Sequence, residues 1–279
     1  MSWCNDHPTV AAVGVCPQCS KAWCQPCSTR GNISKALCPK CGALLGAPPA
    51  GGPGDIFARL FSSESIIMAV SLAVLGLVLG FLGGVLGFGL VFQLIYAGAI
   101  AAYYFNIIQH VGAGASGMPG PSELAGDLGT VFSRGFRGIV CILVGFAPLL
   151  IYIFALHHGR EVFAQRTLFL ELLVAGQLYM PAVLLAVTFG DNGLNALWPP
   201  AWIQIIARAP GPYASFTMLW LITVFIGGAI IAVLQSLVIE IPYAGIIIAS
   251  VISMMFWWFQ AILVGRFIRQ NGDAFGWTS

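Results

Sequence analysis

Charged side chains are scarce in this 279-residue chain: 8% of its residues are Asp, Glu, Lys or Arg, whereas 58% are hydrophobic. Soluble domains carry about 25% charged residues, and the mean hydropathy here is +0.89. The composition therefore excludes an ordinary soluble protein and predicts one built mainly for lipid. A net charge of +2 also argues against the clustered basic surface that nucleic-acid binding requires, so we expect no nucleic-acid partner.

Catalytic motifs are also missing. The chain contains no G-x-S-x-G elbow, P-loop or H-E-x-x-H pair. His157 and His158 are adjacent, but no second intramembrane set of histidine or aspartate accompanies them. We therefore expect no enzyme and no catalytic residue. We expect no cleavable signal peptide either, because residues 1–9 lack a charged segment followed by an apolar one.

Metal-binding residue types, in contrast, are concentrated at the N-terminus. All cysteines except Cys141 lie between Cys4 and Cys41 and, with one histidine, form four pairs that each have two residues between their members. This spacing lets one tight turn present both side chains to a tetrahedral zinc ion. Eight ligands predict two closed zinc sites. The pairs are Cys4 and His7, Cys16 and Cys19, Cys24 and Cys27, and Cys38 and Cys41.

Two ways of sharing the ions are open. Consecutive pairs could hold one ion together, or the first pair could join the third and the second pair the fourth. Only residues 20–23 separate the second pair from the third, which favours the interleaved arrangement, called a cross-brace. One ion would then be bound by Cys4, His7, Cys24 and Cys27, and the other by Cys16, Cys19, Cys38 and Cys41.

The predicted zinc module covers residues 1–45, too few for an ordinary hydrophobic core, so zinc would serve as its core. Trp3 and Trp23 would either cover the metal or form part of a surface for a protein partner. The basic members of that candidate surface are Lys21, Arg30 and Lys35.

Long uncharged runs follow a linker rich in glycine and proline at residues 46–54. No charged residue occurs between Glu64 and Glu123, an interval long enough for two membrane spans of about 20 residues each. Later runs predict four more. We therefore expect an all-α membrane domain at residues 55–270 and a short cytosolic tail at 271–279. The six predicted spans are 65–85, 88–109, 138–156, 168–189, 213–239 and 244–265.

The zinc ligands and the arginines predict one orientation. Cysteine thiolates need a reducing compartment, which places the N-terminus in the cytosol. Six spans return the C-terminus to the same side. All lysines and arginines except Arg160 and Arg166 then face the cytosol, as the positive-inside rule requires.

A short amphipathic stretch precedes each predicted pair of spans, at residues 55–61, 121–137 and 198–209, and we interpret each as an interfacial helix. Each contains an apolar residue, a small residue and an arginine in succession. These arginines are almost equally spaced along the chain: Arg59, Arg134 and Arg208. Regular spacing predicts a threefold repeat of helix and hairpin. The alternative is that the positive-inside rule alone places an arginine there.

Several residues within the spans have both a structural and a functional interpretation. Pro148 and Pro181 should kink their helices. The glycines Gly76, Gly80 and Gly84 favour close helix packing within the bundle, with a dimer interface as the alternative. Glu171 lies near the predicted outer interface, where neutralisation by a neighbouring arginine is favoured over an ion path.

The ligand run C-x2-H-x8-C-x2-C-x4-C-x2-C-x10-C-x2-C resembles a B-box-type zinc finger over residues 1–42. It departs from many B-boxes at Cys38 and Cys41, where histidine is common. This resemblance implies a module for protein contacts. The remainder resembles an uncharacterised family of bacterial polytopic membrane proteins, through residues 132–138 and the tail Gly265, Arg266 and Phe267.

Together these observations predict a protein of the bacterial inner membrane with both termini in the cytosol. Its partners would be the lipid bilayer and a protein that the zinc module recruits or senses. The alternative is a transporter or channel with a regulatory zinc finger. Whether the protein forms a homo-oligomer is left open.

Overall fold

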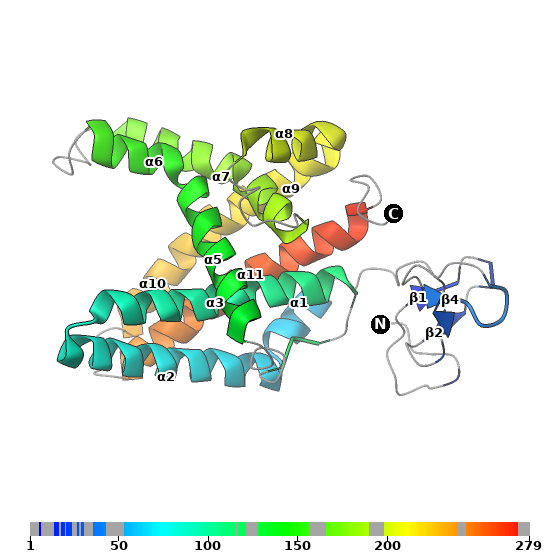
Figure 1. Cartoon of the computed structure of the whole chain (residues 1–279), viewed down its shortest axis with the longest axis horizontal. Helices are drawn as coiled ribbons and strands as arrows, with labels where there is room; N and C mark the ends of the chain where they lie inside the picture. Colours follow the sequence, from blue (N-terminus) through cyan, green and yellow to red (C-terminus); the bar gives the residue numbers. More distant parts are fainter. Residues whose placement is uncertain are drawn as a thin grey trace.

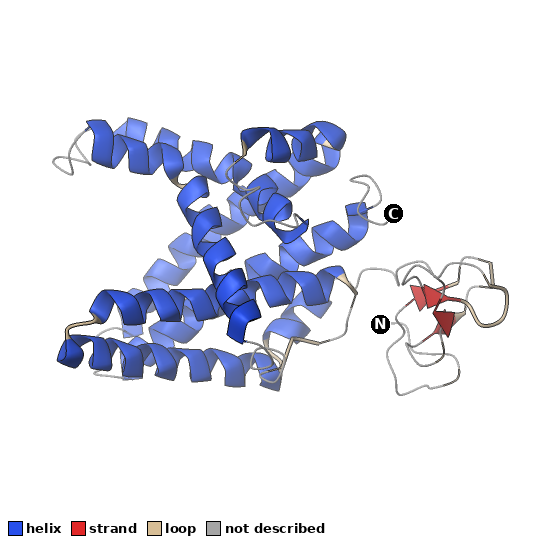
Figure 2. Cartoon of the chain, in the orientation of Figure 1, coloured by secondary structure: helices blue, strands red, loops and turns tan. Residues whose placement is uncertain are grey.

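The structure is a computed structural model of the chain. It describes residues 6, 14–16, 18–19, 21–23, 27, 29–30, 36–42, 53–114, 117–120, 128–156, 166–189, 198–238, 241 and 244–272. Short strands lie in the N-terminal part, and the described chain from residue 53 onward is almost entirely helical (Figure 2).

Two small antiparallel hairpins organise the N-terminal part. β1 (Gly14–Val15) pairs with β2 (Ala22–Trp23), and β3 (Thr29–Arg30) pairs with β4 (Ala36–Leu37). The sequence did not predict these strands, because two residues are too few to show the alternation that identifies a strand.

The helical part contains α1 (Pro53–Leu60), α2 (Ser63–Leu86), α3 (Gly89–Gly112), α5 (Leu128–Gly145), α6 (Ala147–Ile151), α7 (Arg166–Phe189), α8 (Pro199–Arg208), α9 (Pro210–Ile222), α10 (Gly228–Val238) and α11 (Ala244–Asn271). Two π-helical turns continue helices without a break: η1 (Tyr152–Leu156) follows α6, and η3 (Thr223–Gly227) joins α9 to α10. The arrangement is drawn in Figure 1.

Within the part of the chain that the structure describes, five helices are long and apolar enough to cross a membrane: Ser63–Leu86, Gly89–Gly112, Thr167–Thr188, Pro210–Val238 and Ala244–Asn271. A helix of 24 residues, such as α2, is about 36 Å long, enough for a hydrocarbon layer of about 30 Å. These five helices correspond to the first, second, fourth, fifth and sixth predicted spans.

The third predicted span has a different form. The prediction separated an amphipathic helix ending at residue 137 from a span beginning at 138, and this boundary is wrong, because α5 runs unbroken from Leu128 to Gly145. Residues 121–127 lie outside the described residues. The break comes later: the helical segments Ser133–Gly145 and Ala147–Phe154 meet at 65°.

Proline chemistry explains the position of this bend. Pro148 has no N–H to donate to the carbonyl of Val144, four residues earlier, so the helix cannot continue regularly. The hydroxyl of Tyr179 on α7 donates to that carbonyl instead, at 2.8 Å. The kink predicted at Pro148 is therefore confirmed, and a neighbouring helix replaces the missing donor.

A second tyrosine bonds to the backbone near Pro181, which lies inside α7. The hydroxyl of Tyr213 on α9 donates to the carbonyl of Leu178 at 2.8 Å. Unlike the α5–α6 segment, α7 stays continuous through its proline. The two hydroxyls thus fasten α7 to its neighbours on both sides.

Small residues let α5 cross α3 at close range. A side chain added at Gly135 would come within 2.8 Å of the Gly98 Cα, and one added at Gly138 would overlap the Ala101 side chain. Close backbone approach between helices is how small residues stabilise bundles in lipid. The crossing of α5 over α3 is visible in Figure 1.

The core lies where α3 packs against α11. Tyr103, Ile107 and Ile108 of α3 and Trp258 and Ile262 of α11 are fully buried. The rings of Tyr103 and Trp258 meet edge to face, with 4.9 Å between their centroids, a favourable geometry for aromatic pairs. Burial of large side chains at this contact determines how the later helices pack on the first hairpin.

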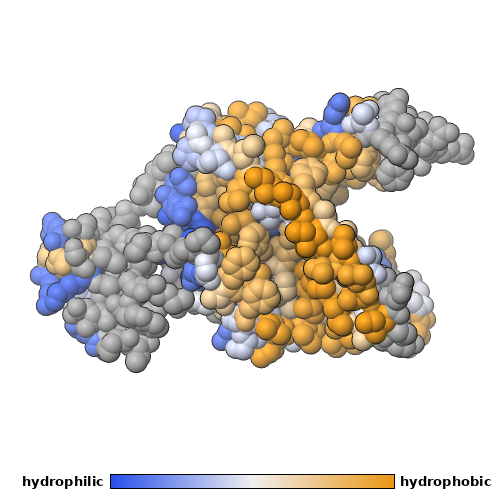
Figure 3. All heavy atoms as spheres, turned by 180° about the vertical axis from the view of Figure 1, so that it is seen from behind, coloured by the Kyte–Doolittle hydropathy of each residue, from blue (hydrophilic) through white to orange (hydrophobic). Residues whose placement is uncertain are grey.

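The outer surface is also apolar. Leu90 and Phe81 expose 74% and 70% of their surface, and many other large hydrophobic side chains on α2, α9 and α10 are exposed. Figure 3 shows apolar residues spread over most of the coloured helical surface on one face. An apolar surface of this size fits a lipid environment and not water.

The glycines of α2 divide between two faces. Gly76 packs against the Tyr96 ring and Gly83 against the Gly89 backbone, whereas Gly80 and Gly84 have open space beside them. Packing within the bundle thus explains Gly76, one of the three glycines that were predicted to favour close helix packing. Glu171 on α7 is exposed.

The three arginines that suggested a repeat have different surroundings. Arg59 on α1 is buried and forms an ion pair with Asp55, Arg134 on α5 donates a hydrogen bond to the buried Asn106, and Arg208 on α8 is exposed. The first and third amphipathic stretches form the separate helices α1 and α8, whereas the second is continuous with its span. The threefold repeat stays a prediction.

We predict that Tyr179→Phe lowers the free energy of unfolding by about 0.5–1.5 kcal/mol, because the Val144 carbonyl loses its donor within an apolar environment. Thermal unfolding in lipid discs measures the loss. The matched control is Tyr96→Phe, since no hydrogen bond of the Tyr96 hydroxyl is found among the described residues. Equal losses in both variants would contradict this role of Tyr179.

Candidate metal centre

The first hairpin holds Cys16 and Cys19 between its two strands, and the second leads into Cys38 and Cys41 after its last strand. Cys16 follows β1 and Cys38 follows β4, and each begins a tight turn that ends in the second cysteine of its pair. The first turn is closed by a hydrogen bond from the Cys16 N–H to the Lys21 carbonyl, at 2.8 Å. In the second, the N–H of Gly42 donates to the Cys38 carbonyl at 2.9 Å, and Gly42 has the positive φ of 69° that glycine adopts most readily.

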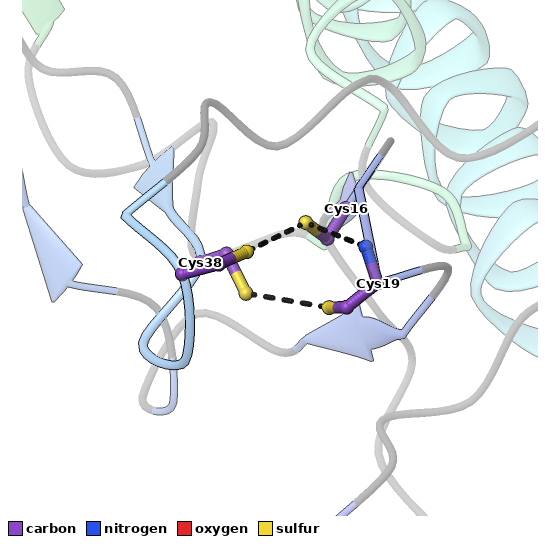
Figure 4. A group of neighbouring side chains, drawn as sticks. Cys16, Cys19 and Cys38 are labelled. Atoms are coloured by element: carbon purple, nitrogen blue, oxygen red, sulfur yellow. Dashed lines mark hydrogen bonds between the residues drawn. The ribbon is translucent and has the colours of Figure 1, made fainter.

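The ligand atoms converge on one point. The sulfurs of Cys16, Cys19, Cys38 and Cys41 all lie within 4.8 Å of one another. Cys16 Sγ is 3.3 Å from Cys41 Sγ, and Cys19 Sγ is 3.7 Å from Cys38 Sγ. Tetrahedral zinc with bonds of about 2.3 Å places its sulfurs about 3.8 Å apart. Figure 4 shows Cys16, Cys19 and Cys38 facing one another, as such a site requires.

Disulfides do not account for this cluster. A disulfide bond is about 2.05 Å long, much shorter than the sulfur separations above, and no described cysteine is in a disulfide. Four thiols within reach of a single ion, two of them buried, fit a structural Cys4 zinc site.

Local hydrogen bonds lower the pKa of two thiols, those of Cys16 and Cys38. Burial raises the pKa of Cys38, but the backbone N–H groups of Lys40 and Cys41 outweigh it and lower this pKa to about 6. The Cys19 backbone N–H, 3.5 Å from Cys16 Sγ, is the main cause of the lowered pKa of Cys16. Thiolate is the form that binds metal.

The same crowding opposes ionisation of the third thiol. The backbone N–H of Lys21 lowers the pKa of Cys19, but burial and the nearby Cys16 and Cys38 outweigh it, and the net shift is upward. Like charges this close disfavour one another. A divalent cation at the centre would remove this repulsion, so the electrostatics of the cluster favour a bound metal.

Two lysines lie next to the cluster. The pKa of Lys21 is lowered, chiefly by the nearby Lys40. Zinc with four thiolates carries a net charge of −2, and these two ammonium groups would balance it. Lys21 was predicted as a partner-binding residue; its position also gives it this electrostatic role.

Trp23 is covered, and does not form part of an exposed surface. Its side chain is 1% exposed and packs with Cys16 and Cys38 in a small core, against which Cys19 and Cys27 are partly buried. Of the two sequence interpretations, covering the metal core is the one that the Trp23 packing supports.

The grouping of ligands agrees with the cross-brace prediction. The sulfurs of the second pair lie together with those of the fourth pair. Cys27 of the third pair packs beside this four-thiol cluster without belonging to it. The remaining predicted ligands, Cys4, His7 and Cys24, lie outside the described residues, as does Trp3.

No match to known proteins adds to this picture. No family model, curated protein or solved structure matches the chain. Both resemblances noted from the sequence therefore stay expectations, and functional inference depends on the geometry of the chain itself.

A second polar centre lies on α1, which packs against α11, and was not predicted from the sequence. Arg59 Nε donates to Asp55 Oδ2 at 3.0 Å, and Arg59 Nη1 donates to the Gly117 carbonyl at 3.2 Å. The spacing of four residues between Asp55 and Arg59 could have indicated their ion pair. Nothing in the sequence indicated Gly117, which is far from Arg59 along the chain.

We predict that Cys16→Ser, Cys38→Ser and the double variant each lose the same amount of zinc, one ion per chain, because both cysteines serve one ion. Metal analysis of the purified protein measures the zinc content. Cys141→Ala, which alters a buried cysteine of α5 away from the cluster, should lose none. A double variant that loses twice as much zinc as the single variants would show that the two cysteines serve different ions.

Proposed function

We propose that the protein is a polytopic membrane protein with a cytosolic zinc module, and that this module recruits or senses a protein partner at the inner membrane. The observation that carries the proposal is the four-thiol cluster of Cys16, Cys19, Cys38 and Cys41. A site with four protein ligands leaves no open position for a substrate, so it serves structure and not catalysis.

Zinc would stabilise this module by replacing a hydrophobic core. Cys16, Trp23 and Cys38 are its buried hydrophobic residues among those described. Structural zinc sites contribute about 10–16 kcal/mol to folding, far more than so small an apolar cluster provides. A rigid metal-built module on a linker suits contact with another protein, which is also the role that the B-box resemblance implies.

The interior of the helical part supports a binding role over transport. The Gln177 amide oxygen accepts a hydrogen bond from Trp220 Nε1 at 3.1 Å, and Asn106 accepts one from Arg134. These buried amides join helices, whereas a substrate path needs polar groups that face a cavity. Glu171, whose alternative interpretation was a role in an ion path, is exposed.

We propose the cytosol for both termini. Thiolate ligands persist in a reducing compartment. Arg59, Arg266 and Arg269 lie at the ends of helices that share one end of the bundle, in keeping with the positive-inside rule. The bacterial inner membrane is the location implied by the resemblance of residues 132–138.

A second zinc ion completes the proposed module, bound by Cys4, His7, Cys24 and Cys27. We predict that Cys27→Ser removes one ion and leaves the Cys16 site filled. Combining it with Cys38→Ser should remove two. Metal analysis and sulfur X-ray absorption measure the count and the ligand sets. An unchanged zinc content in Cys27→Ser would rule out this second site.

The recruitment role is tested by proximity labelling in cells. We compare the full chain with a variant that lacks residues 1–45 and with Cys16→Ser/Cys38→Ser. Both changes should remove the same labelled neighbours, because the double variant loses the ion that holds the two hairpins together. Cys141→Ala is the control. Membrane insertion of every variant is checked by membrane fractionation, and an unchanged set of neighbours after the deletion would refute the role.

A further inference from the structure

The four thiols of the metal centre differ in how far solvent reaches them. Cys16 and Cys38 are buried, and Cys19 is half-buried. Cys41, in contrast, is exposed, and so are the residues on both sides of it in the turn that follows β4. A small dissolved molecule would therefore reach the thiol of Cys41 before the other three.

The exposed thiol of Cys41 lies against a buried thiol that belongs to the other hairpin. Cys41 Sγ is 3.3 Å from Cys16 Sγ. A second contact between the hairpins joins Cys19 Sγ to Cys38 Sγ at 3.7 Å and is drawn in Figure 4. A disulfide bond is about 2.05 Å long, so a small movement of the two turns would bring Cys16 and Cys41 to bonding distance.

A peroxide would convert this contact into a covalent bond. One thiolate attacks an oxygen of hydrogen peroxide, the O–O bond breaks, and the products are a sulfenic acid and hydroxide. A second thiolate then attacks the sulfenic sulfur, the S–O bond breaks, and a second hydroxide leaves. The two thiolates have lost two electrons, and the peroxide has gained them as two hydroxides.

A bond between Cys16 and Cys41 would remove two of the four metal ligands. Cys19 and Cys38 would remain, and two thiolates do not make the closed four-ligand site that holds structural zinc. The two hairpins would nevertheless stay joined, because Cys16 follows β1 and Cys41 lies in the turn after β4. The module would therefore exist in two cross-linked states, one with the metal and one without it.

We propose that the metal centre is a peroxide-sensitive switch, in which oxidation joins Cys41 to Cys16 and releases the ion that the four thiols share. This inference rests on the proposed function, since it makes recruitment of the partner depend on oxidant. A thiol reductant reverses the step by thiol–disulfide exchange: two reductant thiols give up two electrons, become a disulfide and restore both cysteines. The restored thiols can then bind zinc again.

Peroxide treatment of the full-length protein in lipid discs tests the switch. One equivalent of hydrogen peroxide is added to zinc-loaded protein, and a chromogenic chelator measures the released metal. Remaining thiols are then blocked, and the disulfides are mapped by mass spectrometry. We expect the loss of one ion per chain and a disulfide between Cys16 and Cys41. Unchanged zinc content, or a main product within one turn such as Cys16 with Cys19, would overturn the proposal.

Histidine variants separate the exposed thiol from the others. Cys41→His keeps a ligand for zinc but has no thiol at the exposed position, so it should retain its zinc over the time in which the wild type loses one ion. Cys19→His is the matched control: it keeps the contact of Cys16 with Cys41 and should lose its ion as the wild type does. Equal loss from both variants would contradict the role of Cys41. The disulfide map of the wild type needs no variant, so it decides the matter if a histidine variant binds no zinc.

Proximity labelling with and without peroxide connects the switch to recruitment. Brief treatment of cells should remove the neighbours that depend on residues 1–45 in the wild type and leave them in Cys41→His. If the disulfide forms and the same neighbours remain, recruitment stands and the switch is wrong. If no neighbour depends on residues 1–45 even without peroxide, the recruitment role is wrong, and zinc release with the disulfide map decides whether the centre responds to oxidant.

Discussion

The helical part depends on one constraint: in an apolar surrounding, each backbone carbonyl needs a donor from within the protein. α2 and α3 satisfy it with their own ladders. The α5–α6 segment and α7 contain prolines, and tyrosine hydroxyls from neighbouring helices donate to the carbonyls of Val144 and Leu178. At Val144, the bond that replaces the donor missing at Pro148 also joins α5 to α7, so one contact both satisfies the backbone and fixes which helices adjoin.

The N-terminal module has the opposite problem. It has few apolar side chains to bury, and its stability depends on drawing four sulfurs into a space of a few ångströms. The thiols repel when ionised, and two of the four are not fully buried, so the geometry becomes favourable with a cation at its centre. A metal ion would thus take the place, in this module, of the ordinary hydrophobic core of a soluble domain.

Much of this architecture could be predicted from the sequence. Hydropathy identified five helices that are long enough to cross a membrane, because such segments are long and the apolar signal adds up along them. The two-residue spacing identified the cysteine pairs, and the short segment 20–23 between the second and third pairs favoured grouping Cys16 and Cys19 with Cys38 and Cys41. The kink at Pro148 was predicted, but the helix boundary between residues 137 and 138 was wrong, since the amphipathic pattern of residues 128–137 looked like a separate helix. Contacts such as Arg59 with Gly117 join distant residues and leave no periodic pattern to read.

That last contact has a consequence for biosynthesis. The hydrogen bond between Arg59 and Gly117 encloses both α2 and α3 within a single closed loop of the chain. All of its members precede residue 120, so they leave the ribosome before α5 and the helices that follow. Domains and hairpins that are made first tend to fold first. This hydrogen bond allows α2 and α3 to form a complete helical hairpin first. The α3 helix is then already in place as the surface on which α5 and α11 later pack.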